Sequence, residues 1–322
     1  MQINGVLGPI DTAQLGQTLM HEHVTCADWS MRMNFEEDFF DRDAIRDLAI
    51  LRFREARACG ISTVVDGTPI NLGRDIRLIR DVAEGSGVNI IASTGFYYQH
   101  EPGLAGRKED QLVRLMLQEC TKGINGTGIL PGIFKIGVER PSTTDYNRKM
   151  LRAVGRAAAE SGLPVFCHTC PAIRNGDEAL DILLESGVSA HRIIMGHSGD
   201  CDSPDYLESL LRRGVYLGMD RFAPICEADA PFRQRVDVVA ELCRRGWGGK
   251  LFLSHDAAAY LCFFNYWGRH RERIWEESEG MLTRVHREVI PELLRPSRRE
   301  GPLCCVHCID KGDFFLSLRQ LR

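Results

Sequence analysis

The sequence has no apolar run long enough to cross a bilayer, since its longest fully apolar stretch covers only residues 257–264. No basic segment followed by an apolar one comes after Met1, so we predict no targeting segment. No basic stripe stands out, because 40 Lys and Arg and 44 Asp and Glu are scattered along the chain and give a formal net charge of -4. We therefore expect a cytoplasmic protein that binds neither membranes nor nucleic acids.

Two glycine motifs that bind phosphate are also missing. No Gly-x-Gly-x-x-Gly follows the first predicted strand, and Gly-x-x-x-x-Gly-Lys-Ser/Thr does not occur, which disfavours a doubly wound open sheet. Short apolar runs instead alternate with amphipathic stretches, as in repeated strand–helix units around a parallel sheet. The predicted strands are residues 16–24, 60–68, 88–97, 132–138, 164–170, 192–199, 215–221 and 250–256.

Eight such units in a chain of 322 residues predict an α/β fold, a single (β/α)8 TIM barrel. We place the barrel at residues 1–295 and an atypical C-terminal tail at residues 296–322. Residues 43–58 are predicted to be helical, because apolar side chains recur there near helical spacing. They are Ile45, Leu48, Ala49, Leu51 and Phe53.

The twelve cysteines are predicted to be reduced, because a chain of this size needs no disulfides for stability. Several lie inside strand-like runs, as Cys167 does. One group near the C-terminus has the residue types of a zinc site, although its spacing is tighter than that of paired zinc knuckles. Its members are Cys304, Cys305, His307 and Cys308.

Polar residues end several predicted strands, at the edge where a TIM barrel builds its active site. His21 and His23 end the first strand; side chains alternate along a strand, so both point into the barrel while Glu22 turns away. The fifth, sixth and eighth strands end in His168, His197 and Asp256. Four imidazoles and a carboxylate from different strands therefore predict a metal site.

Lys135 interrupts the apolar fourth strand, where an unpaired ammonium is costly and cannot ligate a metal. Three interpretations stay open. The side chain pairs with a carboxylate, forms a Schiff base after its pKa is lowered, or reacts with carbon dioxide to give a carbamate whose oxygens bridge two cations.

The order of these residues resembles the phosphotriesterase family of the amidohydrolase superfamily over residues 5 to 295. The motifs that carry the resemblance are His21-x-His23, Lys135, His168, Gly196-His197-Ser198 and Ser254-His255-Asp256. The resemblance implies two divalent metal ions, bridged by carboxylated Lys135 and a hydroxide that attacks an ester-like bond of a small-molecule substrate. The implied ligands are His21, His23 and Asp256 for the more buried ion, and His168 and His197 for the more exposed one. Zinc is the first candidate, and manganese, cobalt and iron also suit nitrogen and oxygen ligands.

Within that family the chain is most similar to phosphotriesterase-like lactonases. Thr94-Gly95-Phe96-Tyr97 resembles the lactonase segment whose tyrosine orients the substrate, so Tyr97 is the candidate, with Tyr98 as the neighbouring alternative. Gly218-Met219-Asp220-Arg221 resembles the lactonase Asp-Arg pattern. Arg221 is expected to pair with Asp256 or Asp200, to steer a proton or as a structural salt bridge.

Three functions therefore remain. The first is a metal-dependent lactonase with possible aryldialkylphosphatase activity. The second is a Schiff-base lyase that uses Lys135, and the third is a non-catalytic binding protein of the same fold. The aromatic residues 257–268 after the eighth strand are interpreted as an apolar substrate pocket or as the interface of a possible homodimer.

Overall fold

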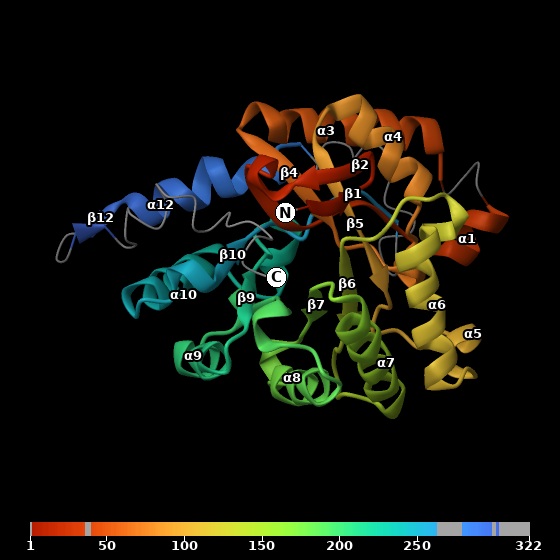
Figure 1. Ribbon diagram of the computed structural model, residues 1–322. Coiled ribbons are helices and arrows are strands. Elements are labelled where there is room, and N and C mark those ends of the chain that lie inside the picture. The colour runs from red at the N-terminus through yellow and green to blue at the C-terminus, as the bar shows by residue number, and fades with distance from the viewer. Residues whose placement is uncertain (1, 36–39, 263–278, 298–300, 303–322) are drawn as a thin grey trace.

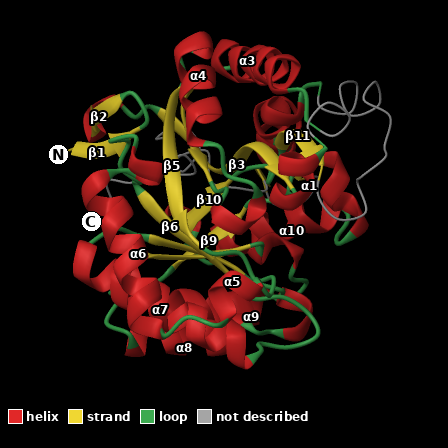
Figure 2. Cartoon of the chain, turned by 90° about the vertical axis from the view of Figure 1, so that its right-hand side faces the viewer, coloured by secondary structure: helices red, strands yellow, loops and turns green. Residues whose placement is uncertain are grey.

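The chain forms a TIM barrel in the computed structural model, which describes residues 2–35, 40–262, 279–297 and 301–302. Parallel strands lie at the centre and helices surround them (Figures 1 and 2). The strands are β3 (Gln17–Ala27), β4 (Ile61–Asp66), β5 (Asn89–Gly95), β6 (Ile133–Gly137), β7 (Val165–His168), β8 (Ile193–Gly196), β9 (Tyr216–Met219), β10 (Leu251–Leu253) and β11 (Ala258–Cys262). Seven of the eight predicted apolar runs contain one of the strands from β4 to β10, and the first run overlaps β3, which extends three residues further, so the predicted fold is confirmed.

The eighth strand position is divided into two pieces that close the barrel. β10 pairs with β9 in parallel, whereas β11 pairs with β3. Between them, the N–H of Asp256 donates to the carbonyl of His21 at 3.1 Å, and the N–H of His23 donates to the carbonyl of Ala257 at 2.8 Å. The chain therefore changes partner strand at the position of Asp256.

Helices cover the outside of the strands. They are α1 (Trp29–Asn34), α3 (Arg42–Ala58), α4 (Ile76–Ser86), α5 (Pro102–Ala105), α6 (Glu109–Lys122), α7 (Asp145–Ser161), α8 (Gly176–Glu185), α9 (Pro204–Arg212), α10 (Phe232–Arg244) and α12 (Ile290–Leu294). In α3, four of the five predicted apolar residues are buried, but Leu51 is 50% exposed. The predicted helix is confirmed, and Leu51 is exposed because, at 100° per residue, it lies off the face of Ile45 and Phe53, which Arg52 occupies instead.

One end of the lumen of the barrel is filled by one apolar side chain from each of the strands β3 to β10. They are Met20, Val65, Ile91, Ile133, Phe166, Ile194, Tyr216 and Phe252. A hairpin of β1 (Gln2–Gly5) and β2 (Gly8–Asp11) adds Ile3 to this cluster and so plugs that end. The polar residues of the opposite end therefore lie against a layer of buried apolar side chains.

A register irregularity in β3 explains how Met20 and His21 both reach the lumen. Strict alternation would send two neighbouring residues to opposite faces. The pairing of β3 with β4 shifts between Leu19 and Glu22, as a β-bulge does. After the bulge, His21 and His23 face inward together, as predicted, and Glu22 faces outward.

Glu22 clamps the divided strand to β3. It is fully buried, and its two oxygens accept four hydrogen bonds, at 2.7 to 3.0 Å. The donors are the Ser254 hydroxyl, the N–H and Nδ1–H of His255, and the N–H of Ala257. Since these donors flank Asp256, the clamp sets the position of that carboxylate as well.

Glu22→Gln is expected to lower the free energy of unfolding of the metal-free protein by about 3–5 kcal/mol, because an amide NH2 would face a buried donor. Urea titration measures this loss. Glu160→Gln on the exposed surface of α7 removes the same charge and is expected to change stability by no more than about 0.5 kcal/mol. Equal urea midpoints for the two variants would contradict the clamp.

Candidate active site

His21, His23 and Asp256 form the first group of candidate ligands. Oδ1 of Asp256 lies 3.2 Å from Nε2 of His23 and 3.4 Å from Nε2 of His21. Both imidazoles are buried, and the Asp256 side chain is 19% exposed. Two Nε2 atoms and a carboxylate oxygen therefore converge in a space that suits one cation.

The outer nitrogens of these two imidazoles are held from behind. Nδ1 of His21 lies 2.7 Å from Oδ2 of the fully buried Asp220, and Nδ1 of His23 lies 2.8 Å from Oγ1 of Thr68. The carboxylate accepts the proton of His21 Nδ1, which leaves the Nε2 lone pair facing the lumen. Thr68 supports His23 in the same way.

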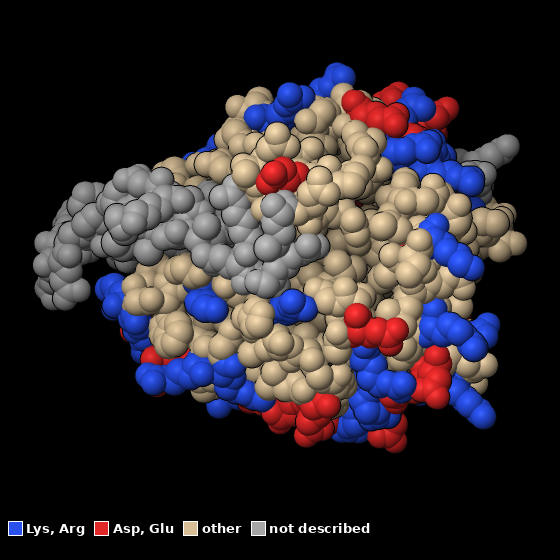
Figure 3. Space-filling view, in the orientation of Figure 1, with Lys and Arg blue, Asp and Glu red and all other residues tan. Residues whose placement is uncertain are grey.

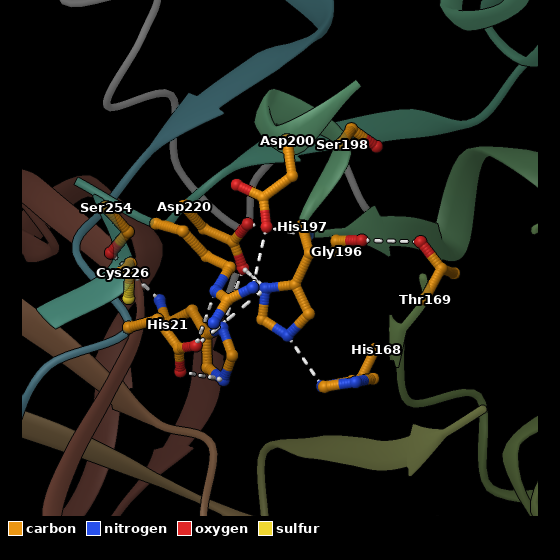
Figure 4. Close-up of polar contacts among 12 residues, drawn as sticks. His21, His168, Thr169, Gly196, His197, Ser198, Asp200, Asp220, Cys226 and Ser254 are labelled. Atoms are coloured by element: carbon orange, nitrogen blue, oxygen red, sulfur yellow. Dashed lines mark hydrogen bonds and ion pairs between the residues drawn. The ribbon is translucent and has the colours of Figure 1, made fainter. Parts of the chain in front are cut away.

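His168 and His197 form the second group (Figure 4). Nδ1 of His168 lies 2.6 Å from Nε2 of His197. On the far side of His168, its Nε2 lies 2.9 Å from Oε2 of Glu139. Asp220 lies between His21 and His197 and accepts the backbone N–H of His197 at 2.6 Å.

Without a cation, the ring nitrogens of this second group cannot all have a hydrogen-bond partner. If His168 donates from Nε2 to Glu139, its Nδ1 is a bare lone pair that needs a proton from His197 Nε2. Neutral His197 would then turn an unprotonated Nδ1 toward Asp220 Oδ2, 3.3 Å away, and this buried nitrogen makes no hydrogen bond to the described residues. A cation between the two imidazoles lets Nδ1 of His197 keep its proton, so the donor set fits a metal.

The pKa values of the imidazoles agree with this arrangement. Burial and the nearby Lys135 lower the pKa of His21 to about 4, and burial lowers that of His197 to about 3, so both are neutral and able to ligate. Burial alone would lower the pKa of His23, but Cys26 and Asp256 outweigh it and raise the pKa to about 10. Without a metal, a proton on His23 would therefore occupy the place of a cation beside Asp256.

Lys135 lies in the lumen beside His21. It is 1% exposed, its Nζ lies 2.5 Å from Nε2 of His21, and the Phe166 ring is 4.4 Å away. Among the described residues, no carboxylate oxygen lies within 4.0 Å of this Nζ, so the predicted carboxylate pairing is not found there. Burial lowers the pKa of Lys135 to about 8, which increases the fraction of neutral amine.

Arg221 joins both carboxylates that the sequence offered as alternatives. Its Nη1 lies 2.6 Å from Oδ2 of Asp200, and its Nε forms a longer ion pair of 3.4 Å with Oδ2 of Asp256. A third carboxylate, Asp229, lies 2.7 Å from Nη2. Asp200 also binds the buried Arg235 at 2.6 Å, so a chain of charges leads from Asp256 away from the lumen.

Tyr97 and Tyr98 both lie beside His168. Their ring centroids are 5.2 and 5.4 Å from that imidazole, and the two tyrosine rings are 4.4 Å apart. The Tyr97 backbone N–H donates to Oδ1 of Asn71 at 2.6 Å. Either ring can therefore form one wall of the second group of ligands.

The backbone is strained at two candidate ligands. His197 and Asp256 have φ angles of 62° and 55°, in the left-handed region that residues other than glycine rarely adopt. Gly67 is required nearby, because a Cβ there would lie 2.6 Å from Cδ2 of His21. Such strain persists only where the surrounding contacts impose it, and it gathers at functional sites.

The sequence prediction named Asp220 only as part of the Asp-Arg pattern, without its contacts to His21 and His197, and it missed Thr68 and Glu139. A period of two through Tyr216 and Gly218 places Asp220 on the inner face of β9 and could have revealed it. Glu139 lies beyond the end of β6, where no periodic pattern applies.

Several predictions fall outside the described part of the chain. The cluster at Cys304 to Cys308 lies there, as do residues 263–268 of the aromatic segment and most of the tail, of which β12 (Pro296–Ser297) and β13 (Gly301–Pro302) are described. The barrel boundary at residue 295 stays a prediction. Within the described ranges, no helix has the length and apolarity to span a membrane.

Charged side chains of both signs lie on the surface of the barrel. Basic and acidic side chains alternate along the lower edge of the face in Figure 3.

The fold and this site define a TIM barrel of the hydrolase type, with candidate metal ligands at the carboxyl ends of its strands. Residues 1–298 match the profile of the phosphotriesterase family, and the chain belongs to that family. It is 38% identical to a phosphotriesterase homology protein of Mycobacterium tuberculosis over 81% of this chain and 82% of that one. It is 29% identical to an aryldialkylphosphatase of Saccharolobus solfataricus, over 95% and 96% of the two chains. The solved structure of the phosphotriesterase from M. tuberculosis superposes with a TM-score of 0.85 at 34% identity, covering 100% of this chain and 97% of that one. The resemblance that the motifs predicted is thereby confirmed.

Proposed function

We propose that this protein is a binuclear metal-dependent lactonase with a weaker activity on aryl phosphotriesters. One observation carries the proposal: four imidazoles turn ring nitrogens toward the same space at the strand ends, and three of their outer nitrogens are held by Asp220, Thr68 and Glu139. Packing alone would not require lone pairs to converge in this way.

The proposed ligands form two positions joined by Lys135. They are His21, His23 and Asp256 for one cation and His168 and His197 for the other. Carbon dioxide would add to the neutral Lys135 amine to give a carbamate and release one proton, and the two carbamate oxygens would face the two positions. Two divalent cations held there would lower the pKa of a bound water and polarise the substrate carbonyl.

The remaining chemistry falls to residues of this chain. Asp256 is placed to take the proton of the attacking water and return it to the alkoxide as the ring C–O bond of the lactone breaks. Arg221 holds Oδ2 of Asp256 and links it to Asp200. Tyr97 lies beside His168, where it can orient the substrate. The Asp220-Arg221 sequence supports a lactone as the preferred substrate, since it resembles the Asp-Arg pattern of lactonases.

We expect about two metal ions per chain by mass spectrometry, together with lactone hydrolysis that a strong chelator abolishes and that added metal restores. The panel contains lactones of increasing alkyl length and one aryl phosphotriester, each assayed before and after chelation. Activity that survives complete metal removal, with borohydride trapping on Lys135, would replace this proposal by Schiff-base chemistry. A protein that binds metals but hydrolyses the phosphotriester fastest would correct the substrate.

The location and the assembly state are proposed on separate grounds. Every cysteine in the described ranges is a free thiol, which supports a reducing, cytoplasmic location. A homodimer stays a prediction, and light scattering of the purified protein tests it.

A further inference from the structure

We infer that Glu139 is a positioning residue that fixes the tautomer of His168 and so sets the affinity of the more exposed metal position. The inference rests on the proposed function and assigns to this carboxylate a task that the family motifs do not include. The contact that carries it is the 2.9 Å approach of Oε2 of Glu139 to Nε2 of His168.

The two ring nitrogens of His168 have different surroundings. Nδ1 faces His197 at 2.6 Å, whereas Nε2 has Glu139 as its hydrogen-bond partner among the described residues. The other near neighbours of the ring include the aromatic faces of Tyr97 and Tyr98. Glu139 accepts a proton only from Nε2, so it holds His168 in the one neutral form whose Nδ1 lone pair points at the second metal position.

Glu139 is itself fixed in place. Its other oxygen, Oε1, accepts the backbone N–H of Arg140 at 2.8 Å. The preceding residue, Val138, donates its backbone N–H to the carbonyl of His168 at 3.0 Å, which ties this segment to the end of β7. Because Glu139 follows Lys135 by four residues, the end of β6 supplies both the proposed bridge and the support of the second position.

The support of His168 differs from that of the other imidazoles. Asp220, behind His21, is fully buried, and Thr68, behind His23, is neutral, whereas Glu139 is a carboxylate with 25% of its side chain exposed. Removing Glu139 should therefore act on the second position alone. Loss of the negative charge and loss of the hydrogen bond should each lower the metal affinity of that position.

The test is a titration of metal-free protein with Co²⁺, followed by visible absorption, in competition with a chelator that resolves two dissociation constants. In Glu139→Ala we expect the weaker constant to rise by about 10–100-fold, the usual effect of losing a carboxylate behind a ligand histidine, and the tighter one to stay within about threefold. Glu139→Gln should fall between this variant and the wild type, because its amide oxygen still accepts the Nε2–H.

Glu160→Gln serves as the matched control, since it removes an exposed glutamate of α7 that lies outside the site. Two unchanged constants in Glu139→Ala, or an equal rise in both, would overturn the inference while leaving the proposed function in place. A wild-type protein that takes up no second Co²⁺ would overturn both. Long-range ¹H–¹⁵N spectra of labelled histidine give a second readout: the Nε2–H form of His168 should dominate in the wild type and lose its dominance in Glu139→Ala.

Discussion

Asp256→Asn is expected to lower kcat for lactone hydrolysis by about 10²–10⁴-fold, the usual contribution of a general base, while most of the metal is retained. The carboxylate divides its two oxygens between two tasks. Oδ1 faces the Nε2 atoms of His21 and His23, and Oδ2 faces Arg221. An asparagine keeps one oxygen for the metal position, but its amide cannot take a proton from water as a carboxylate does.

Single-turnover kinetics together with metal analysis measure this split. Asp229→Asn is the matched control, because Asp229 also pairs with Arg221 but is 38% exposed and lies outside the ligand set. We expect it to lower kcat by less than about tenfold, since an exposed ion pair contributes at most ~1 kcal/mol. Full activity in Asp256→Asn would remove Asp256 from the proton pathway, and complete loss of metal would leave it a role as a ligand only.

The strands and the inward-facing ligands could be predicted because both depend on local pattern. A strand buried on both faces reads as a continuous apolar run, and the runs that end in His168 and His197 match β7 and β8 closely. The inward direction of His21 and His23 was predicted correctly because the register shift of β3, between Leu19 and Glu22, still leaves these two side chains on the same face of the strand.

The supporting residues could not be predicted in the same way, because their tasks depend on contacts between distant parts of the chain. Glu22 acts on Ser254, 232 positions away, and Asp220 acts on His21 across 199 positions. Whether a histidine offers Nδ1 or Nε2 is decided by such partners and leaves no periodic trace. For the same reason, the division of the eighth strand at Asp256 became visible only in the folded barrel.

Lys135→Met is expected to change activity and stability in opposite directions. Loss of the proposed bridge should lower metal-dependent turnover by at least ~10²-fold, because neither position keeps its shared ligand. The metal-free variant should be more stable than the metal-free wild type by about 1–3 kcal/mol, since a buried amine with one hydrogen-bond partner is replaced by an apolar chain of similar length.

The pH dependence of that stability difference separates Lys135 from an ordinary core residue. Burial lowers the folded-state pKa of Lys135 from 10.5 to about 8, so the wild type is destabilised by its ammonium wherever the pH lies below about 8. The penalty disappears as the pH rises toward the unfolded value. Urea titrations of the metal-free proteins at about pH 7 and about pH 10 should therefore show a larger advantage for Lys135→Met at the lower pH.

Lys122→Met, at the exposed end of α6, is the control and should shift stability by no more than about 0.5 kcal/mol at either pH. A variant at position 135 that is less stable without metal would assign Lys135 a structural task, because a lysine kept for its fold should stabilise the fold. A more stable but inactive variant would mean that Lys135 destabilises the fold and is required for the metal-dependent activity. The two outcomes differ in sign, so the midpoints of the urea curves decide between them.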